Sequence, residues 1–511
     1  MTPPAAAGVS VPRHLVLATI EDGLRALSIR VLGAFAESLS LRVTLLYIIK
    51  PLAVAGHPVE FTPGEVRQLA DWLKREQVTH LGFYLMTASL KPCQQLVRAL
   101  REAGFAGTVL TGGVHVTLRP EESLVEGADF AVQGPGELPL KLLFEGADPA
   151  AIPGLVWRRD GAVQVNPPSG AQKLDLDLLP FPIFRFDQDR VLLEGRLRPL
   201  TRRLFQRYAS WNGRYYETIT SRGCLYGCAY CCHVDRGAIR RAGVDRVIRE
   251  LKSVRERHPQ IAGVNIQDDV FFAGSDEWIA EFCRRMPAEV GLPFIVRMIP
   301  RFVTEERVAL LRAAGLEYVT MGLEGSNRVN RVLYRRPEDA KSFLQAARTV
   351  LEAGLHLSID VIIDNPYENE DDLREVARTL NALPRPGWGV VALSLTLFPG
   401  TALYERCAAD GMLERFATDP YDAMLMPSKE GGYRTPAFWR QLYLILLPAI
   451  SADLGEQLIT AGPRNPRAAQ IVERLAARME RAQRITGWLQ RRVPWLYGLL
   501  GRGLGLVGRR S

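Results

Sequence analysis

Three cysteines stand close together near the middle of the chain, at a spacing that suits a metal cluster. Cys224, Cys228 and Cys231 follow the pattern C-x3-C-x2-C in the segment Cys-Leu-Tyr-Gly-Cys-Ala-Tyr-Cys. Thiolate sulfur is the usual ligand of iron–sulfur clusters, and one loop with this spacing can bring three thiolates onto one face of a cubane. The pattern therefore predicts a [4Fe–4S] cluster on these cysteines.

Two alternatives to a cluster stay open from the residues alone. The cysteines could be buried free thiols, or they could bind zinc with Cys232 or His233 as the fourth ligand. Because the three-cysteine pattern is already complete, we expect Cys232 and His233 to support the loop rather than to bind metal. The chain has seven cysteines, and this odd number favours metal binding in a reducing compartment over a disulfide framework.

The cysteine loop follows the first strand of a regular alternation of strands and helices. Six βα units within about 200 residues predict a partial (β/α)6 barrel, whose active site should lie at the C-terminal ends of its strands. The predicted strands are 217–220, 262–266, 294–298, 318–322, 357–363 and 390–397, separated by helices near 243–257, 275–286, 304–314, 337–353 and 370–382.

Polar side chains stand at the ends of several of these strands. Arg297 lies in an otherwise apolar strand, so it needs a buried partner or an anionic ligand. Two adjacent carboxylates after the second strand could instead cap a helix or lie in a solvated turn. The candidates at the strand ends are Asp268, Asp269, Arg297, Glu324, Ser326 and Asp360.

The cysteine pattern, with Tyr230 at its aromatic position, resembles the C-x3-C-x-aromatic-C signature of the radical S-adenosylmethionine (SAM) superfamily. The resemblance covers about 215–410. It implies that SAM chelates the open iron through its amino and carboxylate groups, and that one electron cleaves the sulfonium to give a 5′-deoxyadenosyl radical. It also implies that Tyr230 lies near the adenine.

Further segments carry the same resemblance and imply contacts with SAM. The segment Met-Gly-Leu-Glu-Gly-Ser resembles a Gly-x-Glu-x-Ser segment, which implies that Glu324 and Ser326 contact SAM. Asp268 and Asp269 resemble the acidic segment that receives the SAM amino group, although the Gly-Gly-Glu of simpler members is absent. The location of Arg297 at the end of the third strand predicts a contact with the SAM carboxylate or with substrate. Asp360 lies where the family often shows Gly-Leu-Pro-Gly-Glu-Thr, which implies a cofactor contact, although the usual glycines are missing.

The first 150 residues predict a separate α/β domain. Strands at 14–20, 41–48, 79–86, 107–110 and 129–132 alternate with helices at 23–38, 62–77 and 90–103. This alternation predicts a doubly wound, Rossmann-like parallel sheet with a ligand at the strand C-termini.

Two segments at these strand ends resemble the Gly-Gly-x-His and Gly-Glu-Gly-Glu segments of cobalamin-binding domains fused to radical SAM barrels. Glycines there let a flat macrocycle approach the backbone. The resemblance spans roughly 14–145 and implies cobalamin contacts at Gly112, Gly113, His115, Gly134, Gly136 and Glu137.

One departure from cobalamin proteins concerns the metal. The Asp-x-His-x-x-Gly motif, whose histidine binds cobalt from below in many of them, is missing, since the loop after the first strand reads Glu21-Asp22-Gly23. We therefore expect cobalamin without a protein nitrogen as lower ligand, and we expect His115 to be a hydrogen-bonding loop residue that does not replace it.

The predicted organisation is a cobalamin-binding-like domain at 1–150, a linker with a hairpin at 151–205, the barrel at 206–410 and a mostly helical region at 411–511. The composition, 47% hydrophobic and 23% charged, is that of a globular protein. No leader or membrane span is apparent, so a cytoplasmic protein is expected. The apolar, basic tail, with Trp495 and Tyr497, predicts either an interfacial membrane anchor or a helix packed on the barrel.

These features favour a cobalamin-dependent radical SAM enzyme that transfers a methyl group to a small-molecule substrate. It would need an external electron donor such as flavodoxin or ferredoxin. Oxidative cyclisation or rearrangement of the porphyrin-cyclase type is the first alternative, because fold resemblance does not separate the two. A tRNA methylthiotransferase would need a second cluster, but the other cysteines, such as Cys93, are isolated, so no nucleic acid partner is expected. A non-enzymatic sensor is the last alternative.

Overall fold

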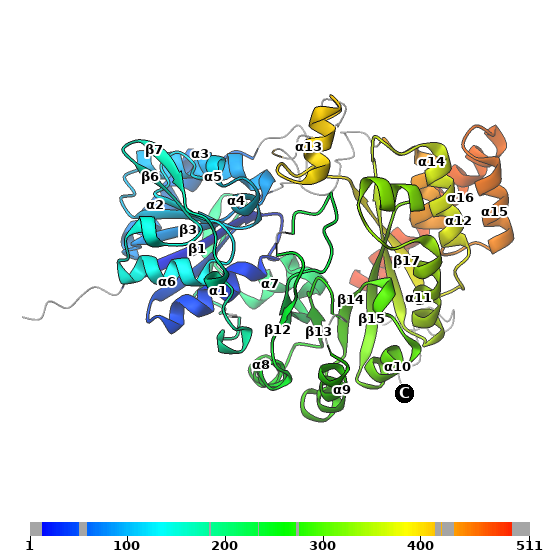
Figure 1. The fold of residues 1–511 in the computed structure, drawn as a ribbon, viewed down its shortest axis with the longest axis horizontal. Helices are drawn as coiled ribbons and strands as arrows, with labels where there is room; N and C mark the ends of the chain where they lie inside the picture. The colour runs from blue at the N-terminus through cyan, green and yellow to red at the C-terminus, as the bar shows by residue number, and fades with distance from the viewer. Residues whose placement is uncertain are drawn as a thin grey trace, which may run out of the picture.

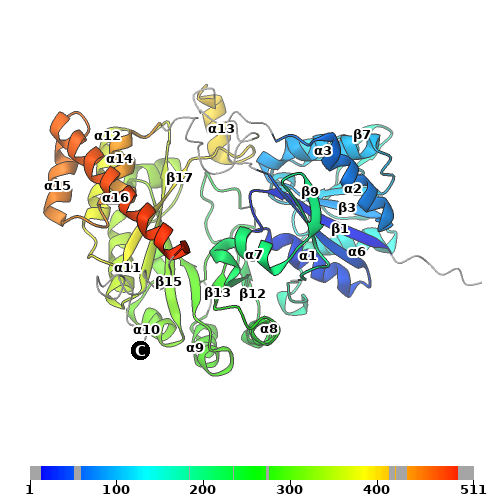
Figure 2. The same cartoon turned by 180° about the vertical axis from the view of Figure 1, so that it is seen from behind.

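The computed structural model describes residues 13–50, 59–182, 185–233, 235–271, 275–413, 421 and 434–492. These residues form two α/β lobes that lie side by side (Figure 1). Seen from behind, the C-terminal helices cover the barrel lobe at the end opposite the N-terminal lobe (Figure 2).

A nine-stranded sheet forms the centre of the N-terminal lobe, in the order β7-β6-β5-β4-β3-β1-β2-β8-β9. The central strand β1 (His14–Glu21) is buried along its whole length, as expected for a parallel strand covered on both faces. It is parallel to β2 and β3, and the parallel run continues through β4 and β5. The other strands are β2 (Arg42–Ile49), β3 (His80–Tyr84), β4 (Thr108–Gly112), β5 (Phe130–Val132), β6 (Leu155–Arg159), β7 (Ala162–Val165), β8 (Arg190–Leu193) and β9 (Arg196–Pro199).

Helices cover both faces of this sheet. On one face lie α1 (Leu27–Ser38) and α6 (Glu137–Glu145), and on the other lie α2 (Pro63–Arg75) and α3 (Leu90–Glu102), so that each face has its own apolar core. The sequence sets the start of α2, because the Thr62 hydroxyl accepts a hydrogen bond from the Glu65 N–H at 3.2 Å. The doubly wound fold is confirmed.

The segment 151–205, which we expected to be a linker, instead adds strands to both edges of the sheet. The predicted hairpin is present as β6 and β7, with Asp160 and Gly161 at positive φ in its turn. A second hairpin, β8 and β9, pairs with β2 on the other edge. Its strands have four residues each and carry arginine at exposed positions, so they leave almost no periodic signal in the sequence.

The second lobe is built on six parallel strands in chain order, β10-β13-β14-β15-β16-β17. Helices pack on the outer face of this curved sheet (Figure 1), and one large apolar core lies between them and the strands. The partial barrel is thereby confirmed. Its strands are β10 (Tyr215–Thr218), β13 (Gly263–Ile266), β14 (Phe294–Met298), β15 (Leu316–Glu324), β16 (His356–Ile363) and β17 (Trp388–Ser394), and its helices are α8 (Val244–Arg257), α9 (Asp276–Arg285), α10 (Glu305–Ala313), α11 (Ala340–Glu352) and α12 (Glu370–Asn381).

The C-terminal region is helical, as predicted, and packs on the barrel. Trp439 and Tyr443 are fully buried in the barrel core, and the Tyr443 hydroxyl donates to the Leu373 carbonyl at 2.5 Å. The region contains α14 (Ala437–Gln441), α15 (Ala452–Ala461) and α16 (Pro466–Arg492), and α13 (Ala402–Ala409) precedes it. The predicted tail anchor, at 493–511, lies outside the described residues. Across the described ranges, the search for a helix able to cross a membrane finds none.

Candidate active site

The loop that carries the cysteines begins at a two-stranded ribbon of β11 (Ser221–Arg222) and β12 (Arg240–Arg241). Asp268 holds this base: its carboxylate accepts hydrogen bonds from the N–H groups of Thr220, at 2.6 Å, and Ser221, at 3.0 Å, and from the Thr220 hydroxyl at 2.5 Å. Arg241 lies 3.5 Å away, and Asp268 is fully buried. The contact with SAM predicted for Asp268 does not match this position, because its oxygens already bind the loop.

The cysteine loop is fixed by main-chain contacts. Cys224 donates to the Asp235 carbonyl at 2.9 Å and accepts from the Gly237 N–H at 2.8 Å. Gly223 has a φ of 110°, and a Cβ there would lie 2.1 Å from the Ala238 carbonyl oxygen, so only glycine fits. The loop therefore occupies the C-terminal edge of the barrel sheet.

The three cysteines of the C-x3-C-x2-C pattern are free thiols, as is the adjacent Cys232. Burial raises the pKa of each thiol, that of Cys231 to about 12. Thiols of raised pKa become thiolates when they bind a metal centre, whose charge replaces the proton. The His233 N–H donates to the Cys231 sulfur at 3.3 Å, and the Arg336 guanidinium lies beside Cys228. These residues fit a cluster bound by three cysteines.

The geometry of the described residues does not support the alternative of a zinc site. In the part of the chain that the structure describes, no three His, Cys, Asp or Glu side chains converge on one metal-ion position. His233 has other partners, with Nε2 3.1 Å from the Asp235 carbonyl oxygen and Nδ1 3.4 Å from the Asp269 carboxylate. A [4Fe–4S] cluster does not need such convergence, because each cysteine binds a different iron.

Next to the cysteine loop, Glu324 and Arg336 form a buried charged pair. Their side chains are 3.7 Å apart, and Arg336 also lies 3.6 Å from Glu338 and donates to the Gly322 carbonyl at 3.3 Å. Burial raises the pKa of Glu324, while the charge of Arg336 opposes that shift. Glu324 ends β15 with a φ of 64°, so the strand turns sharply at this carboxylate.

Tyr230 and Asp360 extend this group on either side. Tyr230 hydrogen-bonds with Glu324 and packs edge-on against Tyr334, with ring centroids 4.7 Å apart. Burial, together with the charge of Glu324, raises the pKa of Asp360 to about 7. The structure thus brings together three residues that the sequence predicted separately as cofactor contacts.

Ser326 lies apart from this group. It is only 2% exposed, and its hydroxyl donates to the Asp372 carboxylate at 2.6 Å and accepts from the Val329 N–H at 3.2 Å. These bonds tie the end of β15 to α12. The SAM contact predicted for Ser326 therefore does not match its position.

A cavity of about 1020 Å³ lies between the two lobes. Residues at the C-terminal ends of β1, β3, β4 and β5 line one side, and residues of β10, β13, β14 and β15 line the other. Ligand pockets usually measure about 300–1,000 Å³, so this one has room for a large ligand. The polar residues that the barrel contributes include Glu217, Asn265, Gln267, Arg297 and Thr320.

The predicted glycines form one edge of this cavity, together with Glu137. Gly113 has a φ of 114°, and a Cβ there would lie 2.8 Å from the Leu85 carbonyl oxygen. Because glycines leave the main chain uncovered, a flat macrocycle can lie against this edge. The glycines concerned are Gly112, Gly113, Gly134 and Gly136.

His115, in contrast, does not line the cavity. It is fully buried, with Nδ1 3.1 Å from the Thr87 hydroxyl and Nε2 3.1 Å from the Glu122 carboxylate. Its place matches the hydrogen-bonding role that we expected and not the cofactor contact that the resemblance implied.

The end of β1 lines the cavity with carboxylates instead of a histidine. Glu21 accepts from the N–H groups of Arg25 and Ala26, each at 3.2 Å, and burial raises its pKa to about 7. Of the described residues of the N-terminal lobe, no histidine lines the cavity; His233, which does, comes from the cysteine loop.

Arg297 lies on the cavity side of the barrel, and Asp269 lies beside His233 of the cysteine loop. Arg297 is exposed and lines the cavity, and its guanidinium donates to the Gln267 amide oxygen. The sequence predicted that Arg297 needs a buried partner or an anionic ligand, and in the structure its partner is the side-chain amide of Gln267. The side chain of Asp269 is 44% exposed and faces His233, unlike that of its buried neighbour Asp268.

One ion pair across the cavity was not predicted from the sequence. Arg222, on the barrel side, donates to Glu137 of α6 at 2.7 Å, and the Glu137 side chain is only 5% exposed. Arg222 directly precedes Gly223 and the cysteines, so this pair joins the cysteine loop to the N-terminal lobe. No local pattern could reveal it, because it exists only when the lobes pack together.

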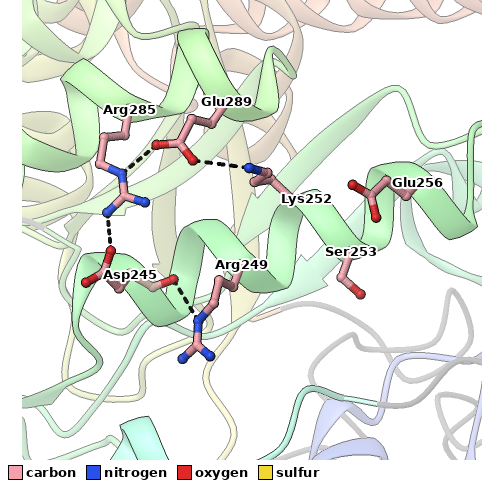
Figure 3. A pocket seen from close by; sticks show the side chains of 7 residues that line it. All are labelled: Asp245, Arg249, Lys252, Ser253, Glu256, Arg285 and Glu289. Carbon is pink, nitrogen blue, oxygen red and sulfur yellow. Dashed lines mark hydrogen bonds and ion pairs between the residues drawn. The ribbon is translucent and has the colours of Figure 1, made fainter.

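A second hollow, of about 560 Å³, lies between α8 and α9 (Figure 3). Its charges are already paired: Glu289 binds Arg285 at 2.7 Å and Lys252 at 3.3 Å, and Asp245 binds Arg285 as well. Such mutually paired surface charges favour a solvated feature over a binding site. It is lined by Asp245, Arg249, Lys252, Ser253, Glu256, Arg285 and Glu289.

Comparison with known families agrees with this geometry. Residues 218–380 match the radical SAM superfamily, and residues 14–144 match the B12 binding domain. The chain thus combines a B12-binding domain with a radical SAM domain that follows it. The enzyme's cofactors are accordingly a [4Fe–4S] cluster, SAM and cobalamin.

Two curated proteins resemble this radical SAM enzyme. It is 23% identical over 354 residues to an uncharacterised methyltransferase of Pyrococcus horikoshii, across 68% of this chain and 72% of that protein. It is 27% identical over 265 residues to the tryptophan 2-C-methyltransferase of Streptomyces laurentii, across 43% of this chain and 44% of that protein. The chain thus matches less than half of the latter relative.

Two solved structures share the enzyme's fold. The radical SAM methyltransferase TsrM from Kitasatospora setae, with cobalamin and a [4Fe–4S] cluster bound, has a TM-score of 0.61 and 18% identity, covering 78% of this chain and 76% of that chain. The cobalamin-dependent SAM radical enzyme OxsB has a TM-score of 0.63 and 15% identity, covering 97% of this chain and 75% of that chain. At such identities the likeness concerns the fold alone.

Proposed function

We propose that this enzyme transfers a methyl group to an unactivated carbon of a small-molecule substrate bound in the cavity between its lobes. The observation that carries the proposal is the position of that cavity. Its N-terminal side is the glycine edge suited to cobalamin, and its other side is the polar lumen of the barrel, next to the cysteine loop. The names of the two curated relatives, both methyltransferases, support the same reaction.

When bound, the cluster and SAM supply the radical and cobalamin supplies the methyl group, while the protein binds and orients all three. In this proposal Cys224, Cys228 and Cys231 hold the cluster. Tyr230, Glu324 and Asp360 contact SAM, because they surround one another beside the Cys228 thiol.

The remaining residues of the cavity orient the substrate and exclude water. Arg297 lines the cavity, where its guanidinium can hold an anionic group of a substrate or the methionine carboxylate of SAM. Asp269 lies beside the cavity-lining His233 and can accept from a cationic group such as the SAM ammonium. The Arg222–Glu137 pair holds the lobes together at the cavity edge, and a closed site protects a reactive radical from solvent.

The product pattern tests the proposal. Anaerobically reconstituted and reduced enzyme should form 5′-deoxyadenosine from SAM and, with an extract that contains the substrate, also S-adenosylhomocysteine. A metabolite that takes up label from methyl-labelled SAM identifies the substrate. Deoxyadenosine without adenosylhomocysteine, in the presence of that metabolite, would contradict methyl transfer and favour cyclisation or rearrangement.

A pair of neighbouring variants tests the SAM site. Glu324→Gln should weaken SAM binding, measured by equilibrium dialysis, because Glu324 lies beside Tyr230 and the cysteine loop. Ser326→Ala is the matched control, since Ser326 is bonded to α12 and should leave SAM affinity unchanged. Equal affinities in the two variants would place SAM elsewhere.

The cluster also requires an electron from outside the chain. We propose that a low-potential carrier such as flavodoxin or ferredoxin supplies it, because the established cofactors include no other reductant.

A further inference from the structure

The cysteine loop reaches the surface between its first two cysteines. Leu225 is 42% exposed, and Gly227 is exposed with open space where a Cβ would point. The described part of the chain therefore leaves the outer side of this loop uncovered. A protein that docks there would lie directly over the residues that hold the cluster.

Three exposed arginines lie around the cysteine loop, and two of them donate hydrogen bonds to it. Arg236 donates to the carbonyls of Cys231, at 2.8 Å, and His233, at 2.9 Å. Arg301 donates to the Tyr226 hydroxyl at 3.2 Å and lies over its ring.

The third arginine, Arg335, follows Tyr334, whose carbonyl accepts the Ala229 N–H at 2.8 Å. The three arginines thus come from different segments and meet around the same loop.

The positive charge of these arginines is not neutralised within the described residues. None of the three forms an ion pair there, and the nearby acids have other partners. Asp235 binds Lys173 at 2.6 Å and Arg240 at 3.2 Å, and the buried Glu338 accepts a hydrogen bond from Tyr226. In the hollow of Figure 3, by contrast, cations and acids are paired with each other.

We propose that Arg236, Arg301 and Arg335, with the exposed Leu225, form the docking surface for an acidic, low-potential electron-carrier protein. The inference rests on the proposed function only in that the cluster must be reduced. The carrier is oxidised by one electron and the cluster is reduced by one electron, with no atom transferred. Redox partners form small, transient complexes, and complementary charge speeds their association. An apolar centre with a basic rim, directly over the cluster loop, matches that chemistry.

Stopped-flow reduction of the reconstituted holoenzyme tests this surface without any substrate. The probe is a reduced acidic ferredoxin, and the readout is the bleaching of the cluster. Arg335→Glu should lower the second-order rate constant about tenfold or more and weaken its dependence on salt, because charge steering changes association rates by about 10–10³-fold. Arg335 is preferred because, within the described residues, its side chain forms no hydrogen bond with the cysteine loop, whereas those of Arg236 and Arg301 do.

Two controls separate docking from other causes. Arg159→Glu makes the same change of charge on an exposed arginine of β6, at the far edge of the N-terminal sheet, and should leave the rate unchanged. Reduced methyl viologen bypasses docking, and it should reduce wild type and Arg335→Glu equally. An unchanged ferredoxin rate in Arg335→Glu, or an equal loss in Arg159→Glu, would overturn the proposal, whereas failed methyl transfer would leave these cluster measurements unaffected.

Discussion

Replacing Asp268 by alanine should release the base of the cysteine loop. The change leaves the N–H groups of Thr220 and Ser221 without their acceptor, and each buried unsatisfied group costs about 1–3 kcal/mol. It also leaves Arg241, whose side chain is 9% exposed, without its carboxylate, and breaking a buried ion pair costs about 3–5 kcal/mol. Since these costs overlap, the expected loss of unfolding free energy is about 3–5 kcal/mol, out of the typical ~5–15 kcal/mol of a folded protein.

The neighbouring Asp269 provides the matched control. Its side chain is 44% exposed and meets His233 at 3.4 Å, so Asp269→Ala should cost no more than the ~1 kcal/mol typical of an exposed ion pair. Urea unfolding of the apo protein measures both variants. Iron content after reconstitution should also fall in Asp268→Ala. Without Asp268, Thr220 and Ser221 lose the bonds that position the base of the cysteine loop.

The reasoning would be refuted if the two alanine variants had unfolding free energies within about 1 kcal/mol of each other, the size of a surface effect. Asp268→Asn adds a finer test, because it keeps the shape and one acceptor but loses the charge facing Arg241. Its unfolding free energy should fall between those of wild type and Asp268→Ala.

Three further predictions concern the cofactors and the buried carboxylate. Alanine at Cys224, Cys228 or Cys231 should abolish the cluster absorbance and iron binding, whereas Cys93→Ala, in the core of the other lobe, should not; a full cluster in all three single variants would contradict the assignment. Cobalamin bound to the enzyme should give a Co(II) electron paramagnetic resonance signal without nitrogen splitting from a lower ligand, since no histidine among the described residues of the N-terminal lobe lines the cavity. Asp360 has a pKa raised to about 7, so its folded state favours the neutral acid, and its contribution to stability is present below about pH 4 and lost as the pH rises through 7. Asp360→Asn should therefore gain stability relative to wild type between those pH values in urea titrations, and a constant difference would show that Asp360 does not titrate there.

Strands such as β1 and β16 were predictable because nearly all of their residues are buried. Both are mostly apolar, as expected for parallel strands covered by helices. The strands β8 and β9 were missed for a different reason: each has only four residues, too few for a clear period, and the edge strand β9 is partly exposed and carries two arginines. The hydrophobic pattern of the sequence therefore predicted the buried strands. It did not predict that the first lobe extends to β9, near residue 200.

In the candidate site, some residues could be assigned from the sequence and others could not. The cysteines could be assigned because ligand type and spacing lie within one short segment. Asp268 and Asp269 could not be told apart, because adjacent residues at a strand end point in different directions, one to the main chain of the loop and the other to the His233 ring. Glu324 and Ser326 differ in the same way, since one meets Arg336 and the other binds Asp372 of α12.

The contact between Arg222 and Glu137 shows why the site is more than the sum of its motifs. Each residue lies in a recognisable segment of its own lobe, 85 positions apart in the sequence, and only the packing of the lobes brings them within 2.7 Å. Because Arg222 leads directly into the cysteine loop and Glu137 stands at the glycine edge, the pair joins the loop proposed to hold the cluster to the edge proposed to hold cobalamin. In the proposed reaction the radical and the methyl group must meet at one substrate carbon, and this ion pair connects the two protein segments that would carry them.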